Sequence, residues 1–249
     1  MKRFGLFLLW VLLLGVCFAC TPAPPIIEET IQPEIIELQI TPAVEHWLPK
    51  VVLCTEDIPN FGLFTRVVPR AELSLEESDL ILRLGERLDD DPFVAVMGVE
   101  QIVVVAGDNV PVSSLSLDSL QAIYAGQITQ WGEVPEANEG VDGKEAPINV
   151  VSYPEGHEIE ILFKRAYLND EPIQSNPQVF LTVDFLQKVM ESSPYALGFL
   201  LESQVPEGMR IISITDEEPI HSNQFVLAIT ARAPQGRLKE LLLCLQNAP

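Results

Sequence analysis

The chain has 249 residues, of which 47% are hydrophobic, so it is long enough to bury a substantial core as one large domain or two small ones. Its 36 acidic residues against 15 Lys and Arg give a formal net charge of -21. This composition provides no basic surface that could neutralise a phosphate backbone, which makes nucleic acid a poor candidate as a partner. A small anion is still possible, because screening over about 8 Å leaves a buried site to its own neighbouring groups.

The first twenty residues have the pattern of a targeting segment. A basic start is followed by an unbroken apolar run over residues 4–19, and Cys20 comes directly after a small residue. The stretch "LLGVCFAC" resembles a bacterial lipobox, so we predict a lipoprotein signal peptide over residues 1–19 and lipidation at Cys20. An ordinary cleaved signal peptide and an uncleaved anchor are the alternatives. Residues 20–35, rich in Pro and Glu, predict a tether, which places the protein outside the cytoplasm and anchors it to the cell membrane.

Two cysteines remain beyond the signal segment. Cys54 and Cys244 form an even pair in an extracytoplasmic chain, which is compatible with a disulfide. Cys244 also lies on an apolar helical face in "KELLLCLQ", where a buried free thiol is equally natural. The sequence leaves both states open, because pairing depends on distances that it does not contain.

Short apolar runs then alternate with helical patterns, which predicts an α/β fold. The runs expected to form strands cover residues 36–40, 50–54, 78–85, 100–107, 147–153, 195–201, 210–215 and 224–230. The patterns expected to form helices cover residues 41–48, 116–126, 159–167, 184–192 and 236–246.

The segment "SYPEGHEIEILF" joins the expected strand at 147–153 to the helix that follows it. Gly156 marks the turn, and apolar residues then recur at helical spacing from Ile159. Ligands of open α/β sheets gather at such turns, where the first helical N–H groups are free. Glu155 and the two acids that follow His157 predict instead that this helix start is capped by its own carboxylates.

The stretch "SLDSLQAIYAGQITQWGEV" (116–134) resembles a signature of the phosphate-type periplasmic substrate-binding proteins of ABC transporters. "VMESSPYALGFL" (189–200) and "QFVLAITARAPQGRLKELLLCLQ" (224–246) are similar to later segments of that family, so the resemblance runs over roughly residues 36–246. It implies a two-lobed periplasmic-binding-protein type II fold, with a mixed sheet in each lobe and the ligand in the cleft between lobes. Lobe 1 would comprise residues 36–105 plus 208–249, and lobe 2 residues 106–207. Tyr124 and Trp131 in the signature are expected to pack, as in that family, instead of stacking on a ligand.

The resemblance also implies a ligand set, which this sequence matches only in part. The family surrounds phosphate with a Ser/Thr-rich first turn, an acid in a strand, an arginine nearby and a Ser-Gly-Thr turn at a helix start. The residues of this chain at those places, and therefore the candidate ligand-binding residues, are Thr41, Asp79, Arg83, Glu155, Gly156 and His157. Only the glycine of the Ser-Gly-Thr turn is kept. Carboxylates at this turn would compete with an anion.

Two functions therefore stand side by side. The first is a substrate-binding lipoprotein of an ABC-type importer that carries a small solute, phosphate or a related oxyanion by family default, to a membrane permease. The second is the same fold without phosphate binding, acting as a sensory or interaction module or binding another small polar ligand. The chain has no Gly-x-Ser-x-Gly elbow, and its three histidines show no metal spacing, so we expect neither an enzyme nor a cofactor or metal. We expect a monomer.

Overall fold

Ten strands of the described chain are joined into one mixed sheet through the 14-residue strand β4. The computed structural model describes residues 33–137, 143, 145–215 and 222–247. The expected signal peptide, Cys20 and the tether as far as residue 32 lie outside these residues. The strands in chain order are β1 (Glu34–Ile40), β2 (Phe61–Val67), β3 (Leu80–Leu84), β4 (Phe93–Ala106), β5 (Ser114–Leu115), β6 (Asn149–Ser152), β7 (Gln178–Val179), β8 (Ala196–Leu201), β9 (Arg210–Ile214) and β10 (Asn223–Thr230).

Helices cover the strands. The α-helices are α2 (Leu48–Glu56), α3 (Leu117–Tyr124), α4 (Glu158–Tyr167), α5 (Val183–Ser192) and α6 (Gly236–Asn247). Four 3-10 helices connect other elements in the described parts, namely η1 (Pro42–Trp47), η2 (Arg70–Glu72), η3 (Trp131–Glu133) and η4 (Glu202–Gln204). Within the described ranges, no helix combines the length and the apolar content that a membrane crossing requires.

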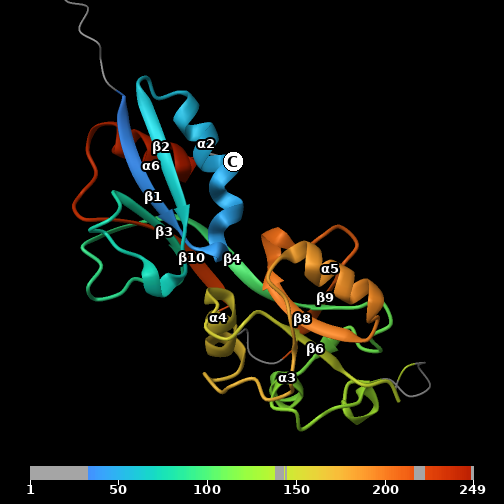
Figure 1. The fold of residues 1–249 in the computed structure, drawn as a ribbon. Coiled ribbons are helices and arrows are strands. Elements are labelled where there is room, and N and C mark those ends of the chain that lie inside the picture. The colour runs from blue at the N-terminus through green and yellow to red at the C-terminus, as the bar shows by residue number, and fades with distance from the viewer. Residues whose placement is uncertain (1–32, 138–142, 144, 216–221, 248–249) are drawn as a thin grey trace, which may run out of the picture. The chain divides into compact units, whose positions relative to one another are not determined.

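Strand β4 belongs to both lobes of the fold. As far as Gln101 it pairs antiparallel with β10, beyond which β3, β1 and β2 follow in that order. Its last part, residues 102–106, pairs antiparallel with β8, and β6 and β7 follow. We call the first group, with helices α2 and α6 beside it, lobe 1, and the second group, with α4 and α5 beside β8, lobe 2 (Figure 1). Parallel and antiparallel neighbours occur in each group, which confirms the expected α/β fold with a mixed sheet in each of two lobes.

The boundaries of the lobes remain a proposal. Strand β9 pairs with the end of β4 and with β5, so its hydrogen bonds connect it to the sheet of lobe 2. We therefore propose that the chain crosses from lobe 1 to lobe 2 near Gln101 and returns to lobe 1 after Ile214. The return would then come a few residues after residue 208, where the sequence placed it.

One expected strand is a helix in the structure. Residues 50–54 lie inside α2, and β2 is the strand that follows it. The reason is visible in the burial pattern, since Trp47, Val51 and Cys54 are buried while Val52 and Leu53 between them are exposed. This spacing of four and then three residues is helical, and the short β-branched run concealed it.

The signature stretch at residues 116–134 forms α3 and the loop that follows it. Ser116 caps α3 through its hydroxyl, which accepts a hydrogen bond from the backbone N–H of Ser119. Tyr124 and Trp131 are fully buried, and the indole of Trp131 donates to the carbonyl of Tyr195 at 3.0 Å. Both aromatic residues therefore pack in lobe 2, as predicted.

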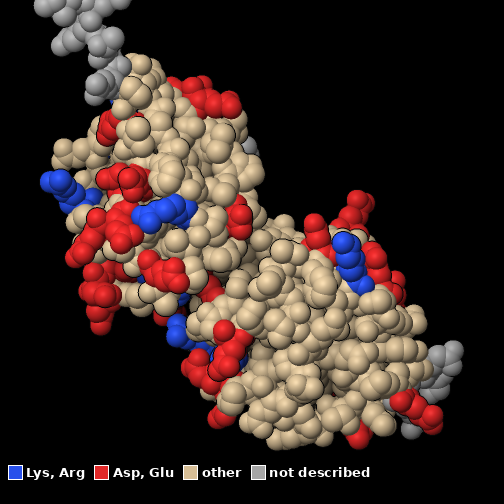
Figure 2. Space-filling view, in the orientation of Figure 1, with Lys and Arg blue, Asp and Glu red and all other residues tan. Residues whose placement is uncertain are grey.

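Figure 2 shows groups of acidic side chains over the visible face and few basic ones, in keeping with the net charge of -21. Some of the basic side chains are held by acids. Arg66 lies 3.2 Å from Glu77, and Arg237 lies 3.7 Å from Glu34. Because these pairs are exposed, each stabilises the fold by less than about 1 kcal/mol.

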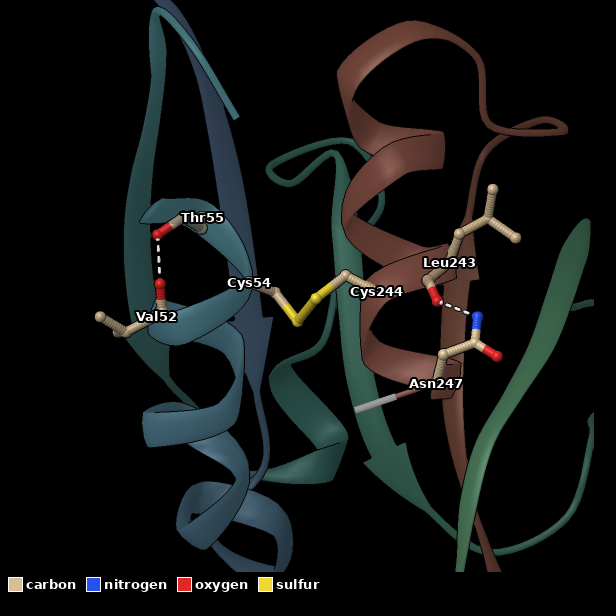
Figure 3. Close-up of a disulfide and its surroundings, with 6 residues drawn as sticks. All are labelled: Val52, Cys54, Thr55, Leu243, Cys244 and Asn247. Atoms are coloured by element: carbon tan, nitrogen blue, oxygen red, sulfur yellow. Dashed lines mark hydrogen bonds between the residues drawn. A yellow bond between two sulfur atoms is a disulfide. The ribbon is translucent and has the colours of Figure 1, made fainter. Parts of the chain in front are cut away.

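Cys54 and Cys244 are joined by a disulfide, which resolves the choice left open by the sequence. The bond joins cysteines that are 190 residues apart in sequence, and the helices that carry them, α2 and α6, lie side by side in lobe 1 (Figure 3). On either side of it, the side chains of Val52 and Leu243 point away from the bond (Figure 3), and about half of each is exposed.

Candidate functional site

The start of α4 reaches across to lobe 1 through one carboxylate. Glu158 Oε2 accepts a hydrogen bond from the hydroxyl of Thr41 at 2.6 Å and from the backbone N–H of Leu84 at 3.3 Å. Its other oxygen, Oε1, lies 3.0 Å from the guanidinium of Arg70. The three donors come from the turn after β1, the end of β3 and helix η2. Three separate segments of lobe 1 thus converge on one side chain of lobe 2.

This contact is buried. Thr41 is 0% exposed and Glu158 is 3% exposed. Burial raises the pKa of Glu158, while Thr41, Arg70 and the Leu84 N–H oppose that rise. A buried carboxylate is costly unless its oxygens are hydrogen-bonded, so these donors are what allow Glu158 to occupy this position.

The turn before α4 directs Glu158 toward lobe 1. Gly156 has a φ of +82°, which side chains with a Cβ rarely adopt, and its N–H donates to Glu160 at 3.2 Å. His157 is the N-cap, and its Nδ1 accepts from the N–H of Ile159 at 3.3 Å. The helix is therefore capped by Glu160 and His157, which leaves Glu158 free to contact the other lobe.

At the helix start, His157 acts as an acceptor through Nδ1 and not as a donor. Its ring stacks on Tyr153, with ring centroids 4.3 Å apart and planes 11° from parallel. Burial lowers the pKa of His157 to about 4, so the ring is neutral at pH 7. Glu155, the preceding acid, is exposed.

The other candidate residues are only partly brought together. Thr41 lies at the site, where its hydroxyl donates to Glu158 and makes no cap hydrogen bond to the helix that follows it. Arg83 is buried near by, but its guanidinium donates to Asp91 at 2.6 Å and to the carbonyl of Glu86 at 2.8 Å. Burial, together with the charge of Arg70, lowers the pKa of Arg83, and Asp91 opposes this.

Asp79 lies away from this site. It precedes β3 and accepts a hydrogen bond from the N–H of Glu37 at 2.9 Å, whereas Thr41 and Leu84 lie at the opposite ends of β1 and β3. Because β1 and β3 are parallel and four or five residues lie between these positions, about 13–17 Å of strand separates the two ends. Asp79, which the family resemblance implied as a ligand-binding acid, is therefore not close to the turn after β1.

Sequence reasoning did not single out Arg70 or Glu158. Arg70 lies on a short 3-10 helix, η2, that no periodicity indicated. Glu158 was grouped with Glu155 and Glu160 as a cap of its own helix. The helical register does contain a signal, since Glu158 precedes the buried Ile159 and lies four residues before the buried Leu162. A carboxylate on the apolar side of a helix requires partners from another element.

A second carboxylate lies where β4 passes between the lobes. Glu100 accepts from the Trp47 indole at 3.0 Å and from the Ser203 hydroxyl at 2.6 Å, and it lies 2.9 Å from His46 Nε2. The side-chain amide of Gln204 lies 3.1 Å from the other ring nitrogen of His46. Burial alone would raise the pKa of Glu100, but the hydrogen bonds from His46, Ser203 and Trp47 outweigh it and lower the pKa. His46 therefore helps to join η1 of lobe 1 to η4 of lobe 2.

Comparison with solved structures shows which known fold has this arrangement. An ABC-type phosphate transport receptor from Vibrio cholerae superposes with a TM-score of 0.69 at 16% identity, covering 86% of this chain and 94% of the other. A putative phosphate ABC transporter substrate-binding protein from Clostridium perfringens, solved with bound phosphate, also gives 0.69, at 15% identity over 85% and 93% of the two chains. This chain has the type II periplasmic-binding-protein fold.

The type II fold is shared by proteins of other roles. A full-length OxyR variant from Pseudomonas aeruginosa matches with a TM-score of 0.60 at 13% identity, covering 86% of this chain and 69% of that one. No protein-family model matches the sequence, and no curated protein matches it either. At such identities the likeness concerns the fold alone, so the function must be argued from the side chains in the cleft.

In the type II fold seen here, the groups facing one another between the lobes form a complete carboxylate site. Thr41, Leu84 and Arg70 supply a hydroxyl, an N–H and a cation, which suit an oxyanion, and Glu158 supplies the oxyanion. A pocket lined by Arg70 and Arg83 opens beside them, and its remaining lining residues, such as Leu75 and Ile229, all belong to lobe 1.

Proposed function

We propose that this protein is an extracytoplasmic lipoprotein, anchored through Cys20, that uses the type II fold as a sensory or interaction module and does not carry phosphate. The observation that supports this proposal is the position of Glu158, whose carboxylate takes the hydrogen bonds of Thr41, Leu84 and Arg70. A phosphate between the lobes would need these donors, and it would bring further negative charge beside a buried carboxylate. The partner would be a component of the membrane, such as a permease, that recognises the joined lobes.

Substrate binding, with phosphate or a related oxyanion carried to an ABC permease, is the second candidate. The presence of Thr41 and Arg70 in the cleft supports it, as does the likeness to a structure that holds phosphate. In this case Glu158 would have to leave its donors when the anion enters. The two functions therefore differ in one measurable property, the affinity of the unmodified protein for phosphate.

The experiment is a thermal-shift and calorimetric titration of the protein lacking residues 1–20, which lie outside the described fold. Phosphate, sulfate and small organic acids are compared at equal ionic strength. A ligand present at 100 times its Kd adds about 2.7 kcal/mol to the stability. We expect phosphate in millimolar excess to leave the melting temperature unchanged. A saturable phosphate signal with one site per chain would instead support the substrate-binding function.

A further inference from the structure

The donors that meet Glu158 have the composition of a ligand site. They come from three segments of lobe 1, and none of them is close to Glu158 in sequence, since the separations are 117, 88 and 74 residues. An exposed ion pair needs one partner, because water meets its remaining lone pairs, whereas this buried carboxylate is met by a hydroxyl, a backbone N–H and a guanidinium. Such a mixed set of donors is typical of sites that recognise the shape and charge of an oxyanion.

We infer that Thr41, Arg70 and the Leu84 N–H form a small-carboxylate site whose resident ligand is the side chain of Glu158, so that this ligand holds the two lobes together without any cargo. The inference rests on the proposed function and specifies how the cleft is closed. In a binding protein the captured solute bridges the lobes. Here the bridge is covalently part of lobe 2, so its effective concentration at the donors is high and constant.

The chemical class of ligand follows from the atoms involved. Replacing Glu158 with alanine removes one methylene group and one carboxylate, which together have the composition of acetate. Alanine is also a good residue for the first turn of a helix, so α4 should persist. The vacated space would be lined by buried donors without partners, a costly state that a small carboxylate can relieve.

The test compares Glu158→Ala with Glu160→Ala. Glu160 lies in the same first turn and is also buried, but it bonds within its own segment, to Lys164 and the N–H of Gly156. We expect acetate and formate to raise the melting temperature of E158A in a saturable manner, while chloride at equal ionic strength does not. The same anions should leave E160A and the unmodified protein unchanged. If E158A gains no stability from acetate, or E160A gains as much, the inference is wrong.

A second variant tests whether Thr41 is one of the donors to the bound acetate. Adding Thr41→Val to E158A removes one donor at nearly constant volume, so the response to acetate should weaken at least tenfold in apparent Kd. An unchanged acetate affinity in the double variant would overturn the assignment of Thr41.

A second measurement covers the case in which E158A does not fold. Thr41→Val and Glu158→Gln each preserve shape, and a double-mutant cycle on unfolding measures their coupling. We expect the two changes together to lower the folding equilibrium constant less than the product of the single effects, by a factor of at least about ten. Additive effects would contradict the resident-ligand site.

The failure of the inference and the failure of the proposed function can be told apart. Phosphate binding by the unmodified protein would refute the proposed function. Absence of phosphate binding together with an E158A variant that ignores acetate would leave the proposed function in place and refute only the resident ligand.

Discussion

His157 accepts a hydrogen bond that requires an uncharged ring. Its Nδ1 accepts the hydrogen bond of the Ile159 N–H, and a protonated nitrogen cannot accept. Its ring stacks on Tyr153 in a partly buried position, where burial lowers its pKa to about 4 from an ordinary value of 6.5. The unfolded chain therefore binds a proton at a higher pH than the folded chain does.

This difference predicts a pH dependence of stability. The contribution of His157 is fully present above pH 6.5 and is lost as the pH falls toward 4, by up to about 3 kcal/mol. In His157→Asn, an N-cap acceptor remains but nothing titrates, so the free energy of unfolding should fall less between pH 7.5 and 4.5. Urea unfolding at both pH values measures this. If the free energy of unfolding falls by the same amount in both proteins between pH 7.5 and 4.5, His157 is not buried as described.

The acids at this helix start illustrate what single residues reveal in a sequence. Their number predicted self-capping, and Glu160 does accept from the N–H of Gly156. The hydrogen-bond partners of Glu158 could not be predicted from the sequence, because they are 74 or more residues away along the chain. A pattern of residue types can show that a carboxylate lies on the apolar side of a helix, but it does not show which distant donors meet it.

At the scale of elements, the contact between α2 and α6 joins the first and the last segment of the chain in lobe 1. The Cys54–Cys244 bond closes a loop of 190 residues, which removes conformational entropy from the unfolded chain. Cys54 is also 1% exposed, so that its sulfur packs in the core as a free thiol would.

Removing this bond should cost stability without changing the fold. For Cys54→Ala with Cys244→Ala, we expect the free energy of unfolding to fall by about 2–5 kcal/mol. Chemical denaturation with and without reductant measures the effect, and the double variant serves as the control because reductant should not alter it. A reduced protein as stable as the oxidised one would contradict this prediction.

Most elements could be predicted from periodicity, and the exceptions have a physical cause. The run at 50–54 is rich in β-branched residues, yet Val51 and Cys54 face the core at helical spacing, and tertiary packing outweighs local propensity there. The strand β2 escaped prediction because its residues are half-buried or exposed and show no clean alternation. Helix η2, which supplies Arg70, is too short to leave a periodic signal.

At the scale of the whole described fold, the lobes are joined by two carboxylates. Glu158 connects the start of α4 to lobe 1, and Glu100 connects η1 and η4 where β4 crosses. The hydrogen bonds to Glu100 lower its pKa despite burial, so the ionised form is stabilised by folding. That stabilisation is present above the ordinary carboxylate range and disappears as the pH falls through the lowered pKa.

For Glu100→Gln we expect a loss of about 1–3 kcal/mol at pH 7, because charged hydrogen bonds to Ser203 and His46 are replaced by neutral ones. The difference from the unmodified protein should shrink as the pH falls through the lowered pKa of Glu100, because Glu100 is then itself protonated. Denaturation at pH 7 and pH 3.5 measures it. The matched control is Glu202→Gln, which changes an exposed acid on η4 next to Ser203 and should change the stability little. A difference of equal size at both pH values would contradict this account.

The two-lobed fold was within reach of the sequence because the signature at 116–134, the buried strand at 100–107 and the closing helix occur in the order that the fold requires. The ligand was not. Whether the cleft between two lobes is empty or occupied depends on contacts such as Thr41 with Glu158, which join residues from opposite halves of the chain.

The continuity of β4 limits how this protein can be divided. Residues 102–106 of β4 supply the neighbour of β8, yet they continue without a break from the segment that pairs with β10. A fragment of residues 106–207, the lobe 2 expected from the sequence, would leave the buried strand β8 with one unpaired edge. An exchange of lobe 2 with another protein must therefore include residues 102–106 of β4, and because β4 continues into lobe 1 without a break, the cut falls inside a strand.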